Sequence, residues 1–312
     1  MQALSIAFHA IVPLFLIIAV GYTVKRLGWI GPEEVRRFNK VTFYTFMPVM
    51  LFYNIYTSDF SQAVRLPYAL FVVGAALGMV AVSFAVTLLA EKMPERRGVM
   101  IQAAFRSNFV LLGLPIAAEL LPDSNLGVTA LMVAIVVPIY NMMSVVVLEY
   151  FRGGKPRAGE VLLAVVKNPL ILGSVAGLLV QALHITLPEV LVSCAGKMNS
   201  AATPLILLLL GASFETREVA RYKKELLVCV GLRLVVFPGA ILTLAAALGL
   251  RDIEFVTVLA MTAAPTAVNS FNMAQQLGGD SQLAGSAVVV STAASFFTLF
   301  VWITLFKQLG MF

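Results

Sequence analysis

The feature that most constrains this chain is a succession of ten long apolar runs, each close to the ~20 residues that a helix needs to cross a bilayer core. The runs cover residues 5–24, 35–57, 66–90, 98–121, 126–150, 161–183, 187–212, 223–249, 253–277 and 281–306. Charged residues occupy only 12% of the 312 positions, whereas soluble domains carry roughly 25%. Ten such runs leave too little polar sequence to form a water-facing surface. We therefore predict an all-α integral membrane protein with ten transmembrane helices, embedded in the lipid bilayer.

The composition also limits which partners and cofactors are expected. The basic residues lie in short, scattered loops rather than on one face, so a nucleic-acid partner is not expected. The two cysteines, Cys194 and Cys229, lie in or beside apolar runs without the spacing of a metal site, and we interpret them as small buried apolar residues. We expect no metal and no other cofactor.

Lysine and arginine are concentrated in alternate loops. Fifteen of them follow the first, third, fifth and seventh runs, within residues 25–40, 92–97, 152–157 and 217–224. Only Arg65 and Arg251 follow the second, fourth, sixth and eighth runs. Because cytoplasmic loops carry the excess of basic residues, this pattern predicts that both termini lie outside, on the periplasmic side of the cytoplasmic (inner) membrane.

The second half of the chain repeats features of the first half. Four pairs share one constant spacing along the chain: Pro13 and Pro169, Gly21 and Gly177, Pro48 and Pro204, and Asp59 and Glu215. Each half holds five runs, an odd number, so the second half must enter the membrane from the opposite side. We predict a single membrane domain of two inverted five-helix repeats, residues 1–152 and 153–312, an architecture typical of secondary transporters.

Two of the runs combine proline with unusual polar density. The fourth contains Ser107, Asn108 and Gly113 before Pro115, and the ninth contains Pro265 followed by Thr266, Asn269 and Ser270. Proline removes a backbone donor and frees carbonyl groups one turn earlier, and in lipid those groups must be satisfied by protein or by water in a cavity. We pair Pro115 with Pro265 of the second half, and predict that helices 4 and 9 break and cross at these prolines.

The direction of these two helices suggests which kind of ligand would bind at their crossing. If both helices break near mid-membrane, the second half of each begins there, and two helix N-termini face one spot. Each N-terminus carries about half a positive charge. The crossing would therefore suit a carboxylate, with asparagine and serine side chains as additional donors.

Five further side chains have alternative interpretations. Arg106 and Arg233 are charges within apolar runs, and each either extends to the membrane interface or attracts an anionic substrate. Lys197 could reach the crossing, and Asn141 could line it. Glu119 is an acid near Pro115 that could carry a coupled proton or lie at the outer surface.

Two pairs of glycines have the spacing of close helix contacts. They are Gly74 with Gly78 and Gly173 with Gly177. We expect internal packing at these glycines, with a homodimer contact as the alternative.

At the predicted crossing the chain resembles the auxin efflux carrier family, which includes bacterial permeases and the plant PIN carriers. The resemblance rests on N-F-V-L-L-G-L-P from Asn108 to Pro115, on Ala263-Ala264-Pro265, and on Arg37-Phe38-Asn39 leading to Pro48. It implies the ten-helix inverted-repeat fold of bile-acid-type transporters, with helices 4 and 9 crossing at their prolines. Asn108 matches an asparagine that lies at the substrate site of PIN carriers.

The resemblance also bears on the substrate. The plant members have a long loop between helices 5 and 6, but here only the short segment 152–161 stands there. This short form is similar to the prokaryotic members, for which malate, malonate and other organic acids are typical substrates. Auxin itself is not implied.

The leading hypothesis is a secondary transporter of small organic anions that works by alternating access, either as an exporter or facilitator or coupled to protons. The alternatives are a channel, a substrate-sensing receptor, or a carrier of amino acids or auxin-like indole acids. An enzyme is not expected, because the sequence has no His-Glu-x-x-His motif and no pair of aspartates within the apolar runs.

Overall fold

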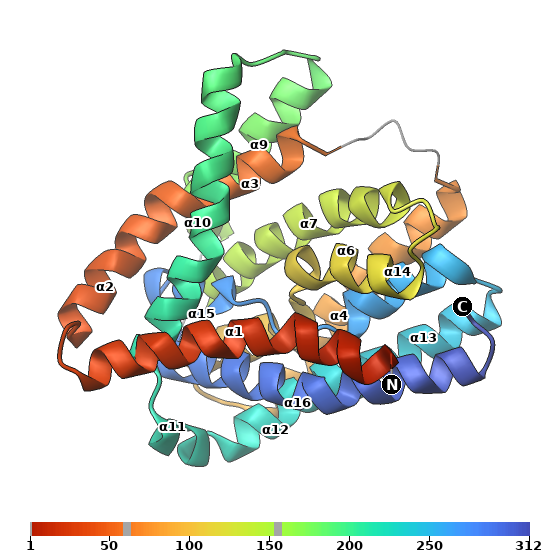
Figure 1. The fold of residues 1–312 in the computed structure, drawn as a ribbon. Coiled ribbons are helices and arrows are strands. Elements are labelled where there is room, and N and C mark those ends of the chain that lie inside the picture. Colours follow the sequence, from red (N-terminus) through yellow and green to blue (C-terminus); the bar gives the residue numbers. More distant parts are fainter. Residues whose placement is uncertain (1, 59–63, 153–157) are drawn as a thin grey trace.

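The computed structural model describes residues 2–58, 64–152 and 158–312, and within these ranges every regular element is a helix (Figure 1). The first half contains α1 (Gln2–Arg26), α2 (Pro32–Val41), the π-helical turn η1 (Thr42–Phe46), α3 (Met47–Tyr56), α4 (Leu66–Ala90), α5 (Pro94–Phe105), α6 (Phe109–Leu120) and α7 (Gly127–Phe151). The second half contains α8 (Ala158–Val166), α9 (Pro169–Ala182), α10 (Glu189–Ser213), α11 (Thr216–Arg221), α12 (Lys223–Gly231), the π-helical turn η2 (Leu232–Val236), α13 (Phe237–Ala247), α14 (Asp252–Ala263), α15 (Asn269–Gln276) and α16 (Ser281–Gln308).

Several of these helices are long and apolar enough to cross a membrane. Among the described residues there are five: α4, α7, α10, α16 and the continuous helix made by α12, η2 and α13. α8 and α9 form a sixth if they are one span with a 58° bend. The helical membrane class is therefore as predicted. The count of ten spans stays a prediction, since it adds α1, the continuous α2–η1–α3 helix and the two broken pairs α5–α6 and α14–α15.

The helix boundaries of the two halves repeat at an almost constant spacing. α1 covers the range 2–26, and α8 and α9 together cover the matching range 158–182. The α2–η1–α3 helix and α10 each cover 25 residues, as do α4 and the α12–η2–α13 helix. α5 and α14 each have 12 residues. The scattered sequence matches thus correspond to a repeat in the order and length of the helices. Residues 153–157, where the predicted halves meet and where the short loop lies, and Asp59 are outside the described ranges.

Glycine brings helix backbones together at two crossings. A Cβ on Gly21 of α1 would lie 2.0 Å from the Leu208 carbonyl oxygen of α10. A Cβ on Gly177 of α9 would lie 2.9 Å from the Phe52 carbonyl oxygen of α3. Only glycine permits such approaches. Phe52 and Leu208 have the same spacing along the chain as Gly21 and Gly177, so the α1–α10 and α3–α9 interfaces are built in the same way.

The two pairs of spaced glycines behave differently. Gly173 also packs internally, since a Cβ added there would lie 2.5 Å from the Pro48 carbonyl oxygen, so the prediction for the Gly173–Gly177 pair is confirmed. At Gly74 and Gly78, however, no described atom beyond the adjoining backbone of α4 itself lies within 4 Å of an added Cβ. Internal packing is therefore the wrong prediction for that pair, because the glycines face outward from α4.

Each π-helical turn is followed two residues later by a proline, Pro48 after η1 and Pro238 after η2. Proline has no N–H and clashes with the carbonyl group four residues earlier. The wider π turn places the neighbouring hydrogen bond one residue further back, as in the bond from the Met47 N–H to the Thr42 carbonyl. Both helices thus pass through a proline without breaking, and η2 carries Arg233.

Polar contacts fix the beginning of α5, which leads into the predicted crossing. The Arg96 guanidinium lies 3.0 Å from a Glu225 oxygen and 3.6 Å from an Asp280 oxygen, and 5.1 Å above the Tyr222 ring. Burial and the neighbouring Asp280 carboxylate raise the pKa of the Tyr222 hydroxyl, which stays protonated and donates a 2.7 Å hydrogen bond to Asp280. These contacts join the starts of α5, α12 and α16.

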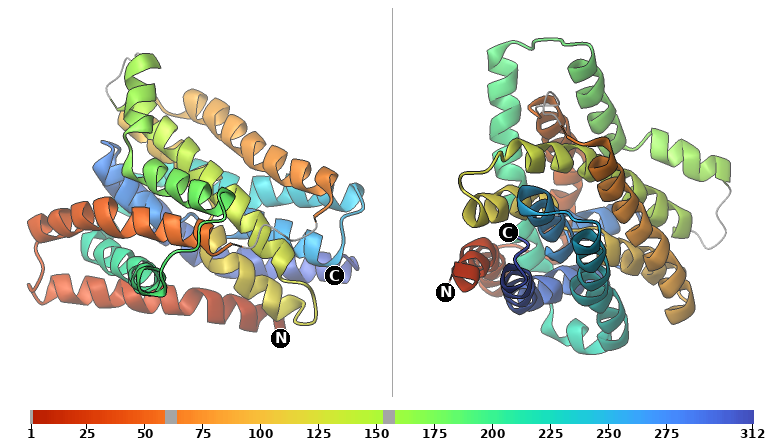
Figure 2. Two further views of the ribbon diagram at one scale, coloured as in Figure 1. Left: turned by 90° about the horizontal axis from the view of Figure 1, so that it is seen from above. Right: turned by 90° about the vertical axis from the view of Figure 1, so that its right-hand side faces the viewer.

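The connected ends of α9 and α10 project beyond the other helices, at the top of Figure 1 and of the right view in Figure 2. This projection exposes large apolar side chains, including Leu183, Val190 and Leu191. Cys194 is exposed here as well, so its interpretation as a buried residue is wrong, whereas Cys229 is buried. In both figures the two termini lie at the same end of the helix bundle.

Candidate functional site

The site is built around two helix breaks that bind each other. Three residues separate α5 from α6, and five separate α14 from α15. The Asn108 N–H donates to the Pro265 carbonyl at 2.8 Å, and the Ala267 N–H donates to the Arg106 carbonyl at 3.0 Å. The two breaks therefore cross as a short antiparallel pair, as predicted for the fourth and ninth spans.

Side chains satisfy other backbone groups at the crossing. The Thr266 hydroxyl donates to the Ala103 carbonyl at 2.8 Å, near the end of α5, and the Thr266 N–H donates to the Ser291 hydroxyl of α16 at 3.1 Å. Nonhelical backbone at membrane depth persists only where protein or water supplies such partners. Threonine and serine do so here without introducing a buried charge.

The two breaks have different local causes. At the second break, Pro265 disfavours helical geometry for the preceding residue, and Ala264 is indeed extended, with φ −64° and ψ 147°. At the first break the extended residue is Arg106, with φ −81° and ψ 98°, and no proline follows it directly. Pro115 instead lies inside α6, on its exposed side. The predicted break at Pro115, and its pairing with Pro265, are therefore wrong, because a membrane helix can contain a proline when its freed carbonyl is otherwise accommodated.

Arg106 lies in the protein interior at the first break. Its side chain is buried, and its guanidinium donates to the Asn141 side-chain oxygen of α7 at 2.5 Å and to the Met273 sulfur of α15 at 2.7 Å. The salt bridges formed among the described residues do not include Arg106. Of the two sequence interpretations, extension to the membrane interface is excluded by this burial.

A small cavity lies against the crossing. It encloses about 30 Å³, room for roughly one or two water molecules. Five of the predicted site residues line it: Arg106, Ser107, Asn108, Asn141 and Asn269. The remaining wall comes from Met50, Leu51, Val110, Leu111, Val137, Tyr140, Thr203 and Ala267. The cavity thus borders the first residues of both α6 and α15.

The polar side chains of this cavity are rich in unused hydrogen-bonding capacity. The amide nitrogens of Asn108 and Asn141 and the hydroxyl of Ser107 are buried and have no hydrogen-bond partner among the described residues. Leaving a buried polar group unpaired costs about 1–3 kcal/mol, so such groups are rare without a reason. Together with the Arg106 guanidinium they form a donor-rich lining that matches an acceptor-rich, anionic ligand.

Four other predicted residues belong to the framework of the crossing and do not line the cavity. Pro265 and Thr266 make the backbone contacts described above. A Cβ on Gly113 would lie 2.8 Å from the ring of the buried Phe109, so a larger residue there would require that ring to shift. Ser270 is buried in the first turn of α15, and its hydroxyl has no partner among the described residues.

Lys197 and Glu119 lie elsewhere. Lys197 is exposed on α10, in an open crevice of about 800 Å³ lined also by Tyr53, Glu189 and Asn199, and this crevice shares no lining residue with the cavity. Lys197 therefore does not line the cavity, and its reach to the crossing stays a prediction. Glu119 is exposed on α6 and does not line the cavity.

The structure also brings together residues that the sequence did not single out as a group. The Asn272 amide of α15 donates to the backbone and side-chain oxygens of Asn39 in α2, at 3.0 and 2.9 Å. The Asn39 amide in turn donates to the Gln275 side-chain oxygen at 2.6 Å. Amides in apolar runs were the available signal, but their partners lie 233 and 236 residues away.

Comparison with known proteins covers nearly the whole chain. A family described as membrane transport protein matches residues 6–303. An uncharacterized transporter of Methanocaldococcus jannaschii is 21% identical over 307 residues, which is 95% of this chain and 98% of the relative. An uncharacterized transporter of Methanothermobacter thermautotrophicus is 22% identical over 304 residues, 94% and 96% of the two chains. A Rhizobium meliloti protein for which malonate transport has been suggested is 24% identical over 296 residues, 93% and 92%.

Proposed function

The chain belongs to a family of membrane transport proteins, which confirms the resemblance found in the sequence, and we propose that it carries small organic anions across the cytoplasmic membrane by alternating access. The proposed substrates are mono- or dicarboxylates. The proposed binding site is the cavity at the crossing of the two broken helices.

The observation that carries this proposal is Arg106. A buried cation in a membrane protein is costly unless it is paired or faces a ligand, and no carboxylate among the described residues pairs with it. Its guanidinium has five N–H donors in a planar fork that matches a carboxylate. The first turns of α6 and α15 add partial positive charge at the same cavity. An organic anion would supply the missing negative charge.

The cavity is lined by residues from two groups of helices, which supports a movement of these groups during transport. α10 packs on α1 and α3, and α3 packs on α9, whereas α4 to α7 pack with α12 to α16; α1 also packs on α16 of the second group. The cavity takes Arg106 and Asn269 from the second group, and Met50 and Thr203 from the first. At about 30 Å³ it is too small for a dicarboxylate. We infer that the two groups separate to admit the substrate from one side and then the other.

The repeated helix boundaries support the full architecture that we propose. Ten spans in two inverted halves account for the nearly constant spacing of those boundaries and for the two breaks at matching places in each half. The charge distribution of the loops then puts both termini outside.

Coupling to protons is constrained by the composition of the site. None of the described residues that line the cavity is acidic. A proton would therefore travel on the substrate itself, as a protonated carboxylic acid, or on a group outside the cavity. Transport driven by membrane potential needs no such group. The relative for which malonate transport has been suggested makes dicarboxylates the first class to test.

The decisive experiment is counterflow in proteoliposomes. Vesicles loaded with unlabelled malonate or malate should take up external labelled substrate transiently above equilibrium, and the initial rate should saturate. Arg106→Met should reduce that rate at least ~30-fold, since truncating one member of a buried charged contact costs about 2–5 kcal/mol. Arg65 is exposed, so the Arg65→Met variant is the matched control and should transport normally. Flux that never saturates and shows no counterflow would instead indicate a channel.

A further inference from the structure

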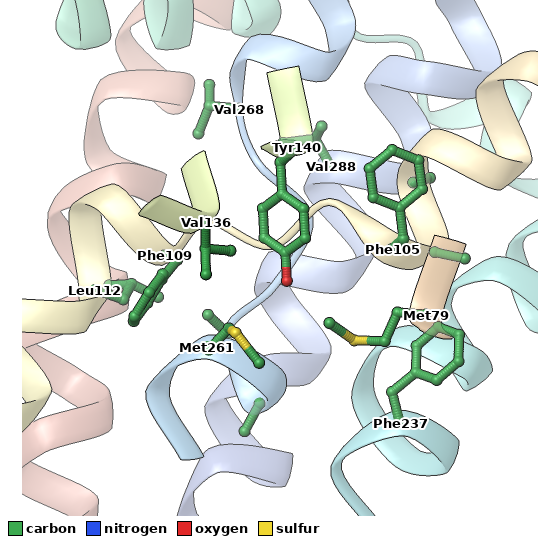
Figure 3. Packing of buried hydrophobic residues seen from close by; sticks show 14 of the residues in the cluster. Met79, Phe105, Phe109, Leu112, Val136, Tyr140, Phe237, Met261, Val268 and Val288 are labelled. Carbon is green, nitrogen blue, oxygen red and sulfur yellow. The ribbon is translucent and has the colours of Figure 1, made fainter. Parts of the chain in front are cut away.

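Arg233 is a second buried arginine at the crossing, and the proposed substrate site does not use it. It lies in η2, its exposed fraction is 0%, and it is the largest side chain among the fully buried described residues. It does not line the cavity. Met79, Phe105, Phe237 and Met261 lie around this part of the core, and the hydroxyl of Tyr140, which lines the cavity, lies among them (Figure 3).

The Arg233 guanidinium contacts the ends of two helices at once. One terminal nitrogen, Nη1, donates to the Phe105 carbonyl at 2.7 Å and lies 3.4 Å from the Ala104 carbonyl, both at the end of α5. The other, Nη2, donates to the Met261 carbonyl at 3.2 Å and to the Thr262 carbonyl, near the end of α14. A single side chain therefore binds the last turns of α5 and α14, which are the first halves of the two broken helices.

Electrostatics explains why an arginine suits this position. The last four carbonyl groups of a helix have no partner within the helix, and each helix C-terminus carries about half a negative charge. Two such ends together supply roughly one negative charge, which compensates one guanidinium. The planar fork of arginine can reach two helix ends, whereas the ammonium of lysine is a point charge.

We propose that Arg233 is the positioning residue of the crossing, which holds the ends of α5 and α14 together. This sets where the breaks begin, and therefore where the first turns of α6 and α15 meet the cavity. The consequence for transport rests on the function proposed above. The positioning role itself does not, because it concerns the backbone geometry of the breaks.

Amide hydrogen exchange can test this role without any substrate. The N–H groups of Asn108, Thr266 and Ala267 are bonded within or beside the crossing, so peptides that contain them report its integrity. In purified Arg233→Met protein we expect these amides to exchange at least ~10-fold faster, while other helices keep their protection, since a hydrogen bond to a charged group is worth about 1.5–3 kcal/mol.

The chain offers a matched control. Arg251 also donates to carbonyl groups at a helix end, to that of Ala246 in the last turn of α13 at 3.2 Å and to that of Leu250 beyond it at 2.7 Å, but it is exposed. Arg251→Met should leave exchange at the crossing unchanged. Arg233→Lys retains the charge without the fork, and should fold while exchanging faster at one break than at the other.

The outcomes separate the alternatives. Wild-type exchange at the crossing in Arg233→Met or Arg233→Lys would overturn the positioning role. Failure of both variants to fold, with Arg251→Met intact, would overturn it in favour of a role in folding alone. Faster exchange at the crossing without detectable anion transport by the wild-type protein would uphold the positioning role and reject the proposed function.

Discussion

The two sides of the helix crossing differ in how their buried polar groups are hydrogen-bonded. On the side where α5 and α14 end, the two terminal nitrogens of Arg233 donate to the terminal carbonyl groups of both helices, and its Nε is left without a partner among the described residues. On the side where α6 and α15 begin, Arg106 faces a cavity, and the amide nitrogens of Asn108 and Asn141 have no partner among the described residues. Satisfied groups favour a fixed framework, and unsatisfied donors favour a ligand. The comparison therefore separates an arginine suited to structure from an arginine suited to binding in one small region.

The largest effect should come from supplying the missing charge within the protein. Asn141→Asp places a carboxylate where the Asn141 oxygen already lies 2.5 Å from the Arg106 guanidinium. The introduced carboxylate would pair with the Arg106 guanidinium, which we propose binds the substrate. We expect the transport rate to fall ~100-fold, because truncation or capture of such a buried charge costs on the order of 2–5 kcal/mol, while the melting temperature stays equal or rises.

The measurement is initial uptake in proteoliposomes beside a thermal melt of the same preparation. Asn141→Ala is the control, because it removes the oxygen without adding charge, and it should be the milder variant. If Asn141→Asp transported anions as well as the wild type, Arg106 would not bind the substrate. The proposed difference in role between Arg106 and Arg233 would then be rejected.

A smaller effect is expected from removing one unpaired donor. Asn108→Ala should raise the apparent KM about 10-fold, since one hydrogen bond to a charged ligand is worth about 1.5–3 kcal/mol, and the protein should still insert and melt normally. The same substitution at Asn199, which lines the separate crevice on α10, should change neither quantity. An unchanged KM in Asn108→Ala would remove this side chain from the site.

The smallest effect should come from Pro115, although the sequence singles it out. It lies inside α6 on the exposed side, away from the cavity lining. Pro115→Ala should therefore change the transport rate by less than about 2-fold, since surface substitutions away from such features usually stay within about 0.5 kcal/mol. Pro265→Ala should slow transport more, because it frees Ala264 to adopt helical geometry. Equal effects of the two substitutions would argue that both breaks have the same cause.

Much of the fold followed from patterns that are local in the sequence. Long apolar runs identify membrane helices because each residue's transfer free energy between water and lipid depends little on its neighbours. The repeat was visible in matches such as Gly21 and Gly177 because only glycine permits the close contacts that both residues make. Polar density also identified the correct two spans for the crossing.

The sequence by itself thus determined a helical membrane protein with repeated helix lengths, its family, and five residues that line the cavity. Only the tertiary structure decided where the first helix breaks, that Lys197 lies in another crevice, and which buried arginine faces the cavity. The reason is that the role of a buried charge depends on its partners. Arg233 meets carbonyl groups 128 and 29 residues away, whereas Arg106 meets an amide oxygen and a cavity, and no local pattern distinguishes those two surroundings.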